Sequence, residues 1–139
     1  MPTRFARAAL TKLLLCAALP AFAQTCATVQ VDNVRAKTGH LMVAAFASAD
    51  SFNKTPLVAL RLPAGETTKM SFQLCGLSGN EVALTLFQDL DGDGKMARNL
   101  VGMPTEPWGS SGTPGAFGPS WETGKVALDG RAIAVKLSQ

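Results

Sequence analysis

The sequence predicts an all-β protein, a single-domain antiparallel β-sandwich of about seven strands. Three observations support this prediction. Short apolar runs recur along the chain, residues within these runs alternate between apolar and polar, and turn-forming residues separate the runs. Since each strand has at least one apolar face to bury, we expect two sheets packed against each other, as in transthyretin-like or immunoglobulin-like domains.

The first four predicted strands follow one another closely. Residues 28–34 alternate, whereas residues 41–47 are apolar on both faces, which indicates a central strand. Residues 58–62 form a short apolar run that ends at a Pro-Ala-Gly turn. Residues 70–75 alternate again and predict a half-buried strand. Between the second and third strands, residues 49–53 could form at most one or two helical turns.

The last three predicted strands include the strongest alternation in the chain, at residues 81–88. Residues 125–128 and 132–137 complete the set. Asp129-Gly130 between them is a two-residue turn sequence, which predicts a β-hairpin. Residues 89–121 contain no clear strand and are dense in Gly and Pro, so they predict a long loop. Three aromatic residues in it favour an ordered loop, because they have apolar area to bury.

Residues 1–23 are interpreted as a secretory signal peptide that is cleaved. Basic residues and no acidic ones precede an apolar run at 13–19, and a site of the A-x-A type ends at Ala23; the basic residues are Arg4, Arg7 and Lys12. The run is shorter than the roughly 20 residues of a membrane span. We therefore expect a periplasmic or secreted domain at 24–139 with no membrane span. A buried N-terminal helix, or a lipid anchor at Cys16 or Cys26, is the alternative.

Cleavage would change the charge and the cysteine content. Of the 13 Lys and Arg residues, three lie in the signal, so ten would remain beside ten Asp and Glu residues. A neutral chain offers no basic footprint for phosphates, so we expect no nucleic-acid partner. Two cysteines would remain, Cys26 and Cys75, and we expect them to form a disulfide in an oxidising compartment. The closed loop of about 50 residues would contribute roughly 4 kcal/mol.

Three segments resemble a known family: Phe-Gln-Asp-Leu-Asp-Gly-Asp-Gly-Lys at 87–95, Gly-Met-Pro-Thr-Glu-Pro-Trp-Gly at 102–109, and Gly-Pro-Ser-Trp at 118–121. They are similar to the bacterial exported family catalogued as domain of unknown function 2141, over nearly all of residues 24–139. The resemblance implies a transthyretin-like or immunoglobulin-like sandwich and no established activity. Trp108 stands where a tyrosine is usual, and no acidic residue follows Lys95.

The most distinctive motif is a run of alternating aspartates. Asp89, Asp91 and Asp93, followed by Gly94 and the backbone carbonyl of Lys95, match the first seven positions of a calcium loop. Three carboxylates within five residues repel one another, and a hard divalent cation that takes six to eight oxygen ligands would relieve this repulsion. The sequence therefore predicts a weak Ca²⁺ site.

The calcium motif is incomplete, because Leu100 stands where an EF-hand has its bidentate Glu. Further ligands would come from Asn99, Glu106 or water, and the expected affinity is about 0.1–1 mM, as in extracellular modules. The alternative is a solvated turn, its charge offset by Lys95 and Arg98.

The aromatic residues of the long loop form a second candidate site. Trp108, Phe117 and Trp121 lie among glycines and could bind a peptide, a glycan or an apolar ligand. The alternative is that they close one end of the sandwich and complete its core, because a domain of this size has little core to spare.

Known catalytic motifs are missing from the sequence. His40 is its only histidine, and the chain has no Gly-x-Ser-x-Gly elbow and no phosphate-binding Gly-Lys-Ser loop. We therefore expect a non-enzymatic binding or scaffold module, stiffened by calcium, whose partner is a protein or an envelope component. A small-ligand carrier using Trp108 to Trp121 is the alternative. A hydrolase with Asp89, Asp91 and Glu106 as acid and base is a third hypothesis.

Overall fold

The computed structural model describes residues 24–138, and the predicted signal peptide lies outside them. These residues form eight strands and one short helix, α1 (Trp121–Gly124). One sheet has the order β4-β1-β8, with β4 at Lys69–Leu77, β1 at Thr25–Asp32 and β8 at Ile133–Lys136. The other has the order β3-β2-β5-β6, with β7 also paired to β5; these strands are β3 (Val58–Pro63), β2 (His40–Phe46), β5 (Glu81–Asp89), β6 (Trp108–Ser110) and β7 (Lys125–Ala127).

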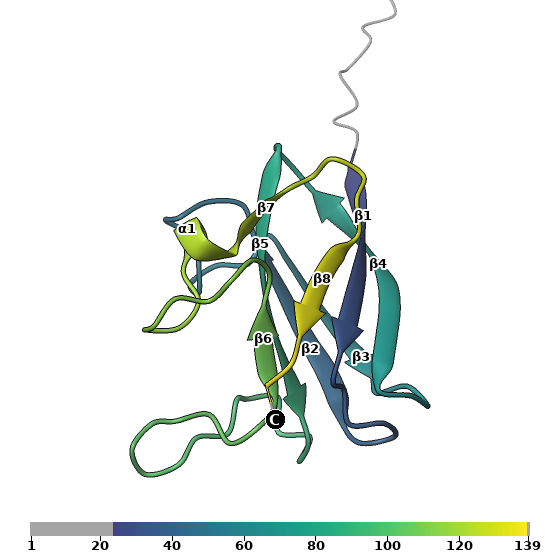
Figure 1. Ribbon diagram of the computed structural model, residues 1–139, viewed down its shortest axis with the longest axis vertical. Coiled ribbons are helices and arrows are strands. Elements are labelled where there is room, and N and C mark those ends of the chain that lie inside the picture. The colour runs from purple at the N-terminus through teal and green to yellow at the C-terminus, as the bar shows by residue number, and fades with distance from the viewer. Residues whose placement is uncertain (1–23, 139) are drawn as a thin grey trace, which may run out of the picture.

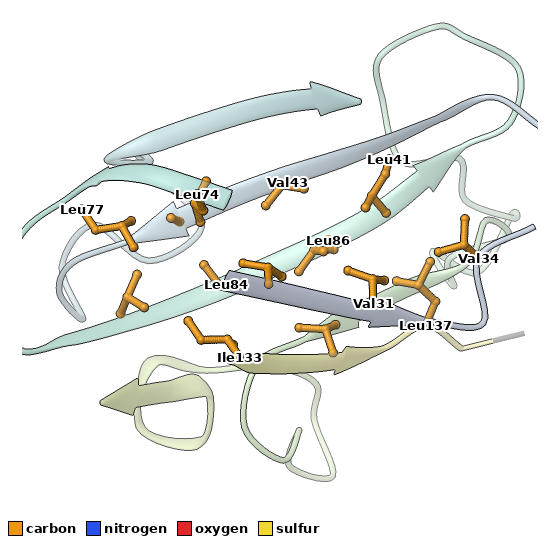
Figure 2. Close-up of a cluster of buried hydrophobic side chains, with 14 residues drawn as sticks. Val31, Val34, Leu41, Val43, Leu74, Leu77, Leu84, Leu86, Ile133 and Leu137 are labelled. Atoms are coloured by element: carbon orange, nitrogen blue, oxygen red, sulfur yellow. The ribbon is translucent and has the colours of Figure 1, made fainter. Parts of the chain in front are cut away.

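The two sheets face each other and enclose the hydrophobic core (Figure 1). Alternation along each strand turns every second side chain inward, as Val29 and Val31 of β1 and Leu84 and Leu86 of β5 illustrate. Figure 2 shows side chains from both sheets meeting in one cluster. The prediction of an all-β sandwich is confirmed.

The predicted strands agree with the structure in position. All seven begin and end within three residues of the predicted bounds. The strand that is apolar on both faces, β2, lies between β3 and β5, as its pattern indicated. Residues 49–53 form turns rather than a helix, one of them closed by the N–H of Phe52 and the carbonyl of Ser48.

The predicted hairpin at Asp129-Gly130 is wrong. Strand β7 pairs with β5, whereas β8 pairs in parallel with β1, so this turn carries the chain from one sheet to the other. The turn sequence specifies a local reversal of the chain but not the partner of the strand that follows. The inward row of β8, Ile133 and Val135, is buried in the core beside β1.

Strand β6 and the short helix α1 were not predicted from the sequence pattern. Strand β6 is three residues long and lies inside the segment predicted as loop, where it pairs with β5 from Thr85 to Phe87. Three residues are too few to show a period of two, and its middle residue is a glycine. A Cβ at Gly109 would lie 2.6 Å from the carbonyl oxygen of Lys136, so only glycine allows this close approach to β8.

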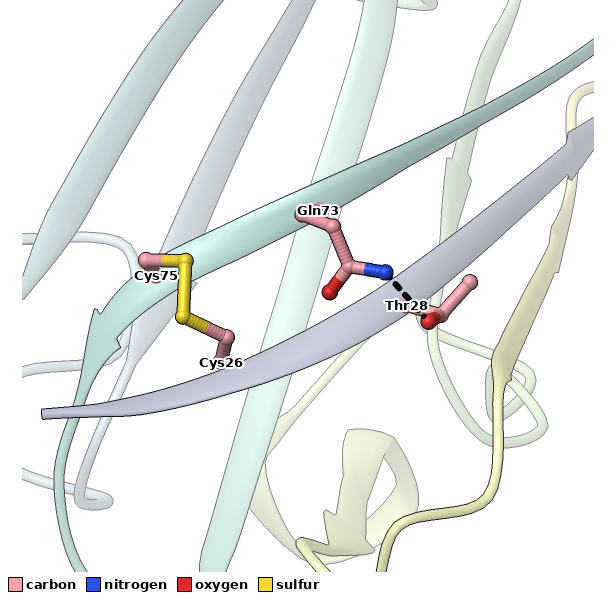
Figure 3. The surroundings of a disulfide bond; sticks show 4 residues. All are labelled: Cys26, Thr28, Gln73 and Cys75. Carbon is pink, nitrogen blue, oxygen red and sulfur yellow. Dashed lines mark hydrogen bonds between the residues drawn. A yellow bond between two sulfur atoms is a disulfide. The ribbon is translucent and has the colours of Figure 1, made fainter.

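The predicted disulfide is confirmed. Cys26 and Cys75 join β1 to β4, and both residues are exposed (Figure 3). On the same pair of strands, the side-chain amide of Gln73 donates a hydrogen bond to the Thr28 hydroxyl at 2.7 Å. The cross-link therefore fastens the first strand of the described chain to its neighbour. Among the described residues, no helix is long and apolar enough to cross a membrane.

Candidate functional site

The candidate site begins where β5 leaves the sandwich. Gln88 continues the inward row of Val82, Leu84 and Leu86 and is fully buried. Its side-chain oxygen accepts the N–H of Arg35 at 2.8 Å, and its amide donates to the carbonyls of Arg35 and Thr38 at 2.7 and 2.6 Å. This side chain fixes the end of β5 to the connection between β1 and β2.

Sequence reasoning missed Gln88 as a positioning residue. The period of two along β5 held the signal, since it places a polar amide on the buried face directly after three apolar residues. A buried amide needs hydrogen-bond partners, so its position predicts contacts with backbone groups nearby.

Asp89, the last residue of β5, is also fully buried, and its carboxylate organises the turn that follows. One oxygen accepts the N–H of Gly92 at 2.8 Å and the other accepts the N–H of Gly94 at 2.9 Å. Both glycines have positive φ, 80° and 77°, which lets their N–H groups converge on the carboxylate. The Asp-Gly pairs of the motif thus produce a tight turn around one buried acid.

Glu106 closes the same loop from its far end. This residue is 6% exposed; its Oε1 accepts the N–H of Leu90 at 2.7 Å, and its Oε2 accepts the N–H of Ala97 at 2.9 Å. One carboxylate therefore bridges two points of the loop that are seven residues apart in sequence. Such charge-assisted bonds to backbone groups are about twice as strong as neutral ones.

The two buried acids lie beside a third, exposed one. Carboxylate oxygens of Asp89, Asp91 and Glu106, here called the acidic cluster, all lie within 4.8 Å of one another. In the part of the chain that the structure describes, no Lys or Arg forms an ion pair with any of the three. The acidic cluster thus concentrates negative charge at one end of the sandwich, with the side chain of Asp91 open to solvent.

The electrostatics differ between the neighbours in the acidic cluster. Burial would raise the pKa of Asp89, but the N–H groups of Gly94 and Gly92, a side-chain hydrogen bond with Asp91 and the positive charge of Arg61 together hold that pKa below its ordinary value. For Asp91, the N–H of Asp93 lowers the pKa, but loss of hydration, the negative charges of Asp93 and Glu106 and a hydrogen bond with Asp89 together raise it. The part of this rise that comes from the charges of Asp93 and Glu106 is repulsion, which a bound cation would relieve.

The remaining predicted ligands lie in the same loop with other contacts. Asp93 is not part of the acidic cluster, and its Oδ1 accepts the N–H of Lys95 at 2.7 Å. The side-chain oxygen of Asn99 accepts the N–H groups of Val101 and Met103 at 3.1 and 3.0 Å. Asn99 therefore shapes the turn at the end of the loop.

Residues 97–105 fold back on themselves as a short hairpin. The N–H of Thr105 donates to the carbonyl of Ala97, and the N–H of Asn99 donates to the carbonyl of Met103, both at 2.9 Å. The guanidinium of Arg98 donates to the carbonyl of Gly102 at 2.8 Å. These bonds hold the hairpin in one conformation although it buries little apolar surface.

A groove of about 760 Å³ lies on the outer face of β5 and β6. Phe87 and Trp108 are part of its lining, with Met103 from the 97–105 hairpin and Phe117 from the loop at 115–119. Of the three aromatic residues proposed from the sequence, Trp108 and Phe117 thus line one groove. Phe117 is exposed to solvent and does not complete the core.

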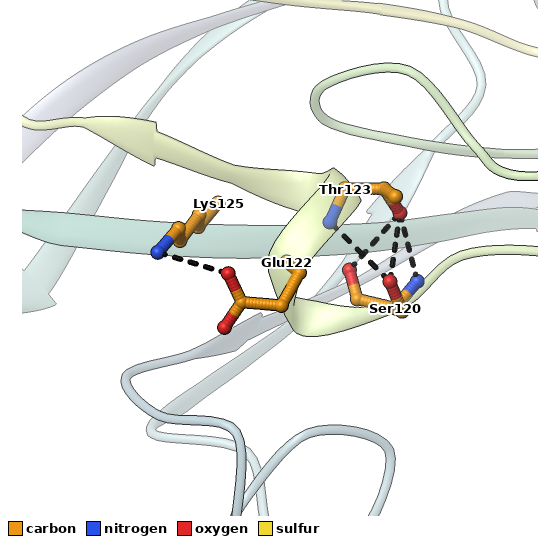
Figure 4. A network of polar contacts seen from close by, with 4 residues as sticks. All are labelled: Ser120, Glu122, Thr123 and Lys125. Carbon is orange, nitrogen blue, oxygen red and sulfur yellow. Dashed lines mark hydrogen bonds and ion pairs between the residues drawn. The ribbon is translucent and has the colours of Figure 1, made fainter.

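Trp121, the third aromatic residue, does not line this groove and begins α1. Ser120 caps this helix: its hydroxyl accepts the N–H of Thr123, and the Thr123 hydroxyl accepts the N–H of Ser120 in return (Figure 4). An ion pair of 3.1 Å between Lys125 and Glu122 follows the cap. Strand β7 follows this helix directly and pairs with β5.

Comparison with known proteins identifies a family and no individual relative. The family model described as an uncharacterized protein conserved in bacteria, domain of unknown function 2141, matches residues 29–136. No curated protein and no solved structure matches the chain. Since the match covers most of the sequence, the chain belongs to this family, as the three resembling segments predicted.

Proposed function

We propose that this member of domain of unknown function 2141 is an exported, non-enzymatic binding module whose acidic cluster takes a calcium ion. The observation that supports the proposal is the convergence of Asp89, Asp91 and Glu106 within 4.8 Å, with no ion pair to a Lys or Arg among residues 24–138. Calcium is a hard cation that prefers oxygen ligands and tolerates irregular geometry. No His or Cys belongs to the acidic cluster, which disfavours zinc.

The hydrogen bonds of the acidic cluster leave room for an ion. Each carboxylate oxygen has two acceptor sites, so the N–H bonds to Asp89 and Glu106 occupy only half of their capacity. The same bonds hold these two side chains in place before an ion arrives. Asp91 has one oxygen bound to the N–H of Asp93, at 3.1 Å, and is exposed. Water would complete the coordination on this open side, which predicts an affinity of about 0.1–1 mM.

Two further features support an exported module rather than an enzyme. The Cys26–Cys75 disulfide persists in oxidising compartments outside the cytoplasm. His40, the only histidine of the sequence, lies at the start of β2 with its Nδ1 at 3.3 Å from the Arg61 guanidinium, and this contact occupies one of the two ring nitrogens that a general base would use. Backbone groups bind both oxygens of Asp89 and of Glu106, which suits a structural role better than proton transfer.

Calcium titration by calorimetry tests the proposal, on protein purified without chelators after export. We expect binding in the range of about 0.1–1 mM and a rise in melting temperature with calcium. Asp91→Asn removes one charge from the acidic cluster without unpairing a buried group, so it should abolish both effects. Asp50→Asn, an exposed aspartate in the turns after β2, is the matched control and should bind normally. Equal binding by Asp91→Asn and the control, or no heat at millimolar calcium, contradicts the proposal.

The groove favours a second candidate function, the binding of a small apolar ligand. Its volume of about 760 Å³ lies within the range of small-molecule sites, about 300–1,000 Å³. A carrier of this kind would change the fluorescence of Trp108 on binding an apolar probe such as a fatty acid, with or without calcium. Trp121 lies outside the groove, so Trp108→Phe should remove most of the change. If the Trp108→Phe variant shows the same fluorescence change with the probe, the groove is not the binding site.

A further inference from the structure

We infer that exposed apolar side chains of the two loops that follow β5 and β6 dock onto the surface of an anionic lipid bilayer. These side chains, here called the apolar tips, are Leu100, Val101, Met103 and Phe117. The calcium dependence that we expect for this docking rests on the proposed function; the docking surface itself rests on the apolar tips.

The apolar tips are far more exposed than apolar side chains of a folded domain usually are. Leu100 and Phe117 are each 107% exposed, and Val101 is 82% exposed. Within the described chain, Leu57 is the other large apolar residue that is exposed, at 42%. Large apolar side chains that are this exposed mark a contact with another apolar surface.

The shape of this region favours a bilayer over a protein partner. Leu100 and Val101 lie at the end of the 97–105 hairpin and project from the loop, and Figure 1 shows this loop extending away from the body of the sandwich. Projecting side chains need a pocket in a rigid partner, but they enter a fluid interface without one. Backbone hydrogen bonds and the two bonds to Asn99 keep the hairpin folded without burial of the tips.

The charges around the apolar tips explain why an ion would control docking. Residues 89–106 hold four acidic and two basic residues, so their net charge of −2 repels an anionic surface. One Ca²⁺ would neutralise that charge. The exposed Lys95 and Arg98 would then attract acidic headgroups, and Arg98 lies within the hairpin itself. The open side of the ion could also accept phosphate oxygens of the lipids.

Co-sedimentation with vesicles tests the inference, on protein expressed from the full sequence and purified after export. The probes are vesicles of phosphatidylcholine alone and of phosphatidylcholine with phosphatidylglycerol, each in calcium and in EGTA. We expect sedimentation with the anionic vesicles, increased at least about fivefold by calcium, and little with the neutral ones. The double variant Leu100→Ser/Val101→Ser should lose about tenfold in binding, whereas Leu57→Ser should bind like the unchanged protein.

The outcomes separate this inference from the proposed function. Calcium binding by calorimetry without sedimentation overturns the docking surface and leaves the proposed function standing; a protein would then be the occupant to seek. Sedimentation that requires Leu100 and Val101, but is equal in calcium and EGTA, supports the docking surface and contradicts its dependence on calcium, and calorimetry then decides whether the calcium site exists. Normal sedimentation of the double variant overturns the docking surface. That variant should still bind calcium, which shows that it is folded.

Discussion

The sheets and the loop at 89–106 place their residues in opposite ways. In the sheets, apolar side chains such as Leu84 fill the core, and polar residues such as Gln73 are mostly exposed, with the buried Gln88 at the end of β5 as an exception. In the loop, Asp89 and Glu106 are buried while Leu100 and Val101 are exposed. The loop is held by hydrogen bonds from backbone N–H groups to carboxylates, so its apolar residues are not needed for its own stability. The comparison shows that a loop can stay folded through polar contacts alone while its apolar side chains remain exposed.

The largest change in the free energy of unfolding should come from a substitution in the core between the sheets. Leu84→Ala removes a fully buried side chain from the centre of the core and should lower the free energy of unfolding by about 2–5 kcal/mol. Urea unfolding followed by tryptophan fluorescence measures the change. Leu57→Ala, at an exposed position, should stay within about 0.5 kcal/mol of the unchanged protein. Equal losses in the two variants would show that burial does not distinguish these positions.

An intermediate effect should come from the buried acids of the loop. Glu106→Gln keeps the shape of the side chain but offers one oxygen to two N–H groups, those of Leu90 and Ala97. One buried N–H then meets an amide NH₂, and we expect a loss of about 1–3 kcal/mol, measured in EGTA so that no cation contributes.

Glu66→Gln is the matched control for Glu106→Gln. It disrupts an exposed ion pair with Lys37 and should cost less than about 1 kcal/mol. If Glu106→Gln unfolds at the same urea concentration as this control, the buried carboxylate does not stabilise the loop. Burial would then stabilise the apolar residues of the sheets but not the acidic residues of the loop.

The smallest change in the free energy of unfolding should come from the exposed apolar residues of the loop. Leu100→Ser removes a fully exposed apolar side chain, so the free energy of unfolding should change by no more than about 0.5 kcal/mol. The same urea titration measures it. If Leu100→Ser lowers the free energy of unfolding as much as Leu84→Ala does, Leu100 is buried in solution. The loop would then bury this apolar residue as the sheets do.

The strands could be predicted because their signals are local. Alternation at 81–88 and the apolar faces at 41–47 mark β5 and β2 directly, since a strand with one or two buried faces must repeat with a period of two. The disulfide followed from cysteine content and the expected compartment. All three residues of the acidic cluster were among the predicted ligands, because the alternating aspartates and glycines match the start of a calcium loop and Glu106 follows as a further carboxylate.

Other features depended on contacts between distant parts of the chain. The Asp129-Gly130 turn has the sequence of a hairpin, yet the two strands beside it belong to different sheets. Gln88 acquired its role from backbone groups of Arg35 and Thr38, which only the folded chain brings near. No periodicity revealed that the 97–105 hairpin exposes its apolar residues, because the hairpin is too short to have an inner face.

For this protein, the amino-acid sequence by itself determined the all-β class, the positions of seven strands, the disulfide and the acidic motif after β5. Each follows from residue types at short spacing, where side-chain periodicity and charge act within a few residues. Only the tertiary structure decided which sheet each strand joins, that Asp89 and Glu106 are buried together, and that Leu100 and Val101 remain outside. These depend on which backbone groups and surfaces meet when distant segments pack, and no local pattern encodes that choice.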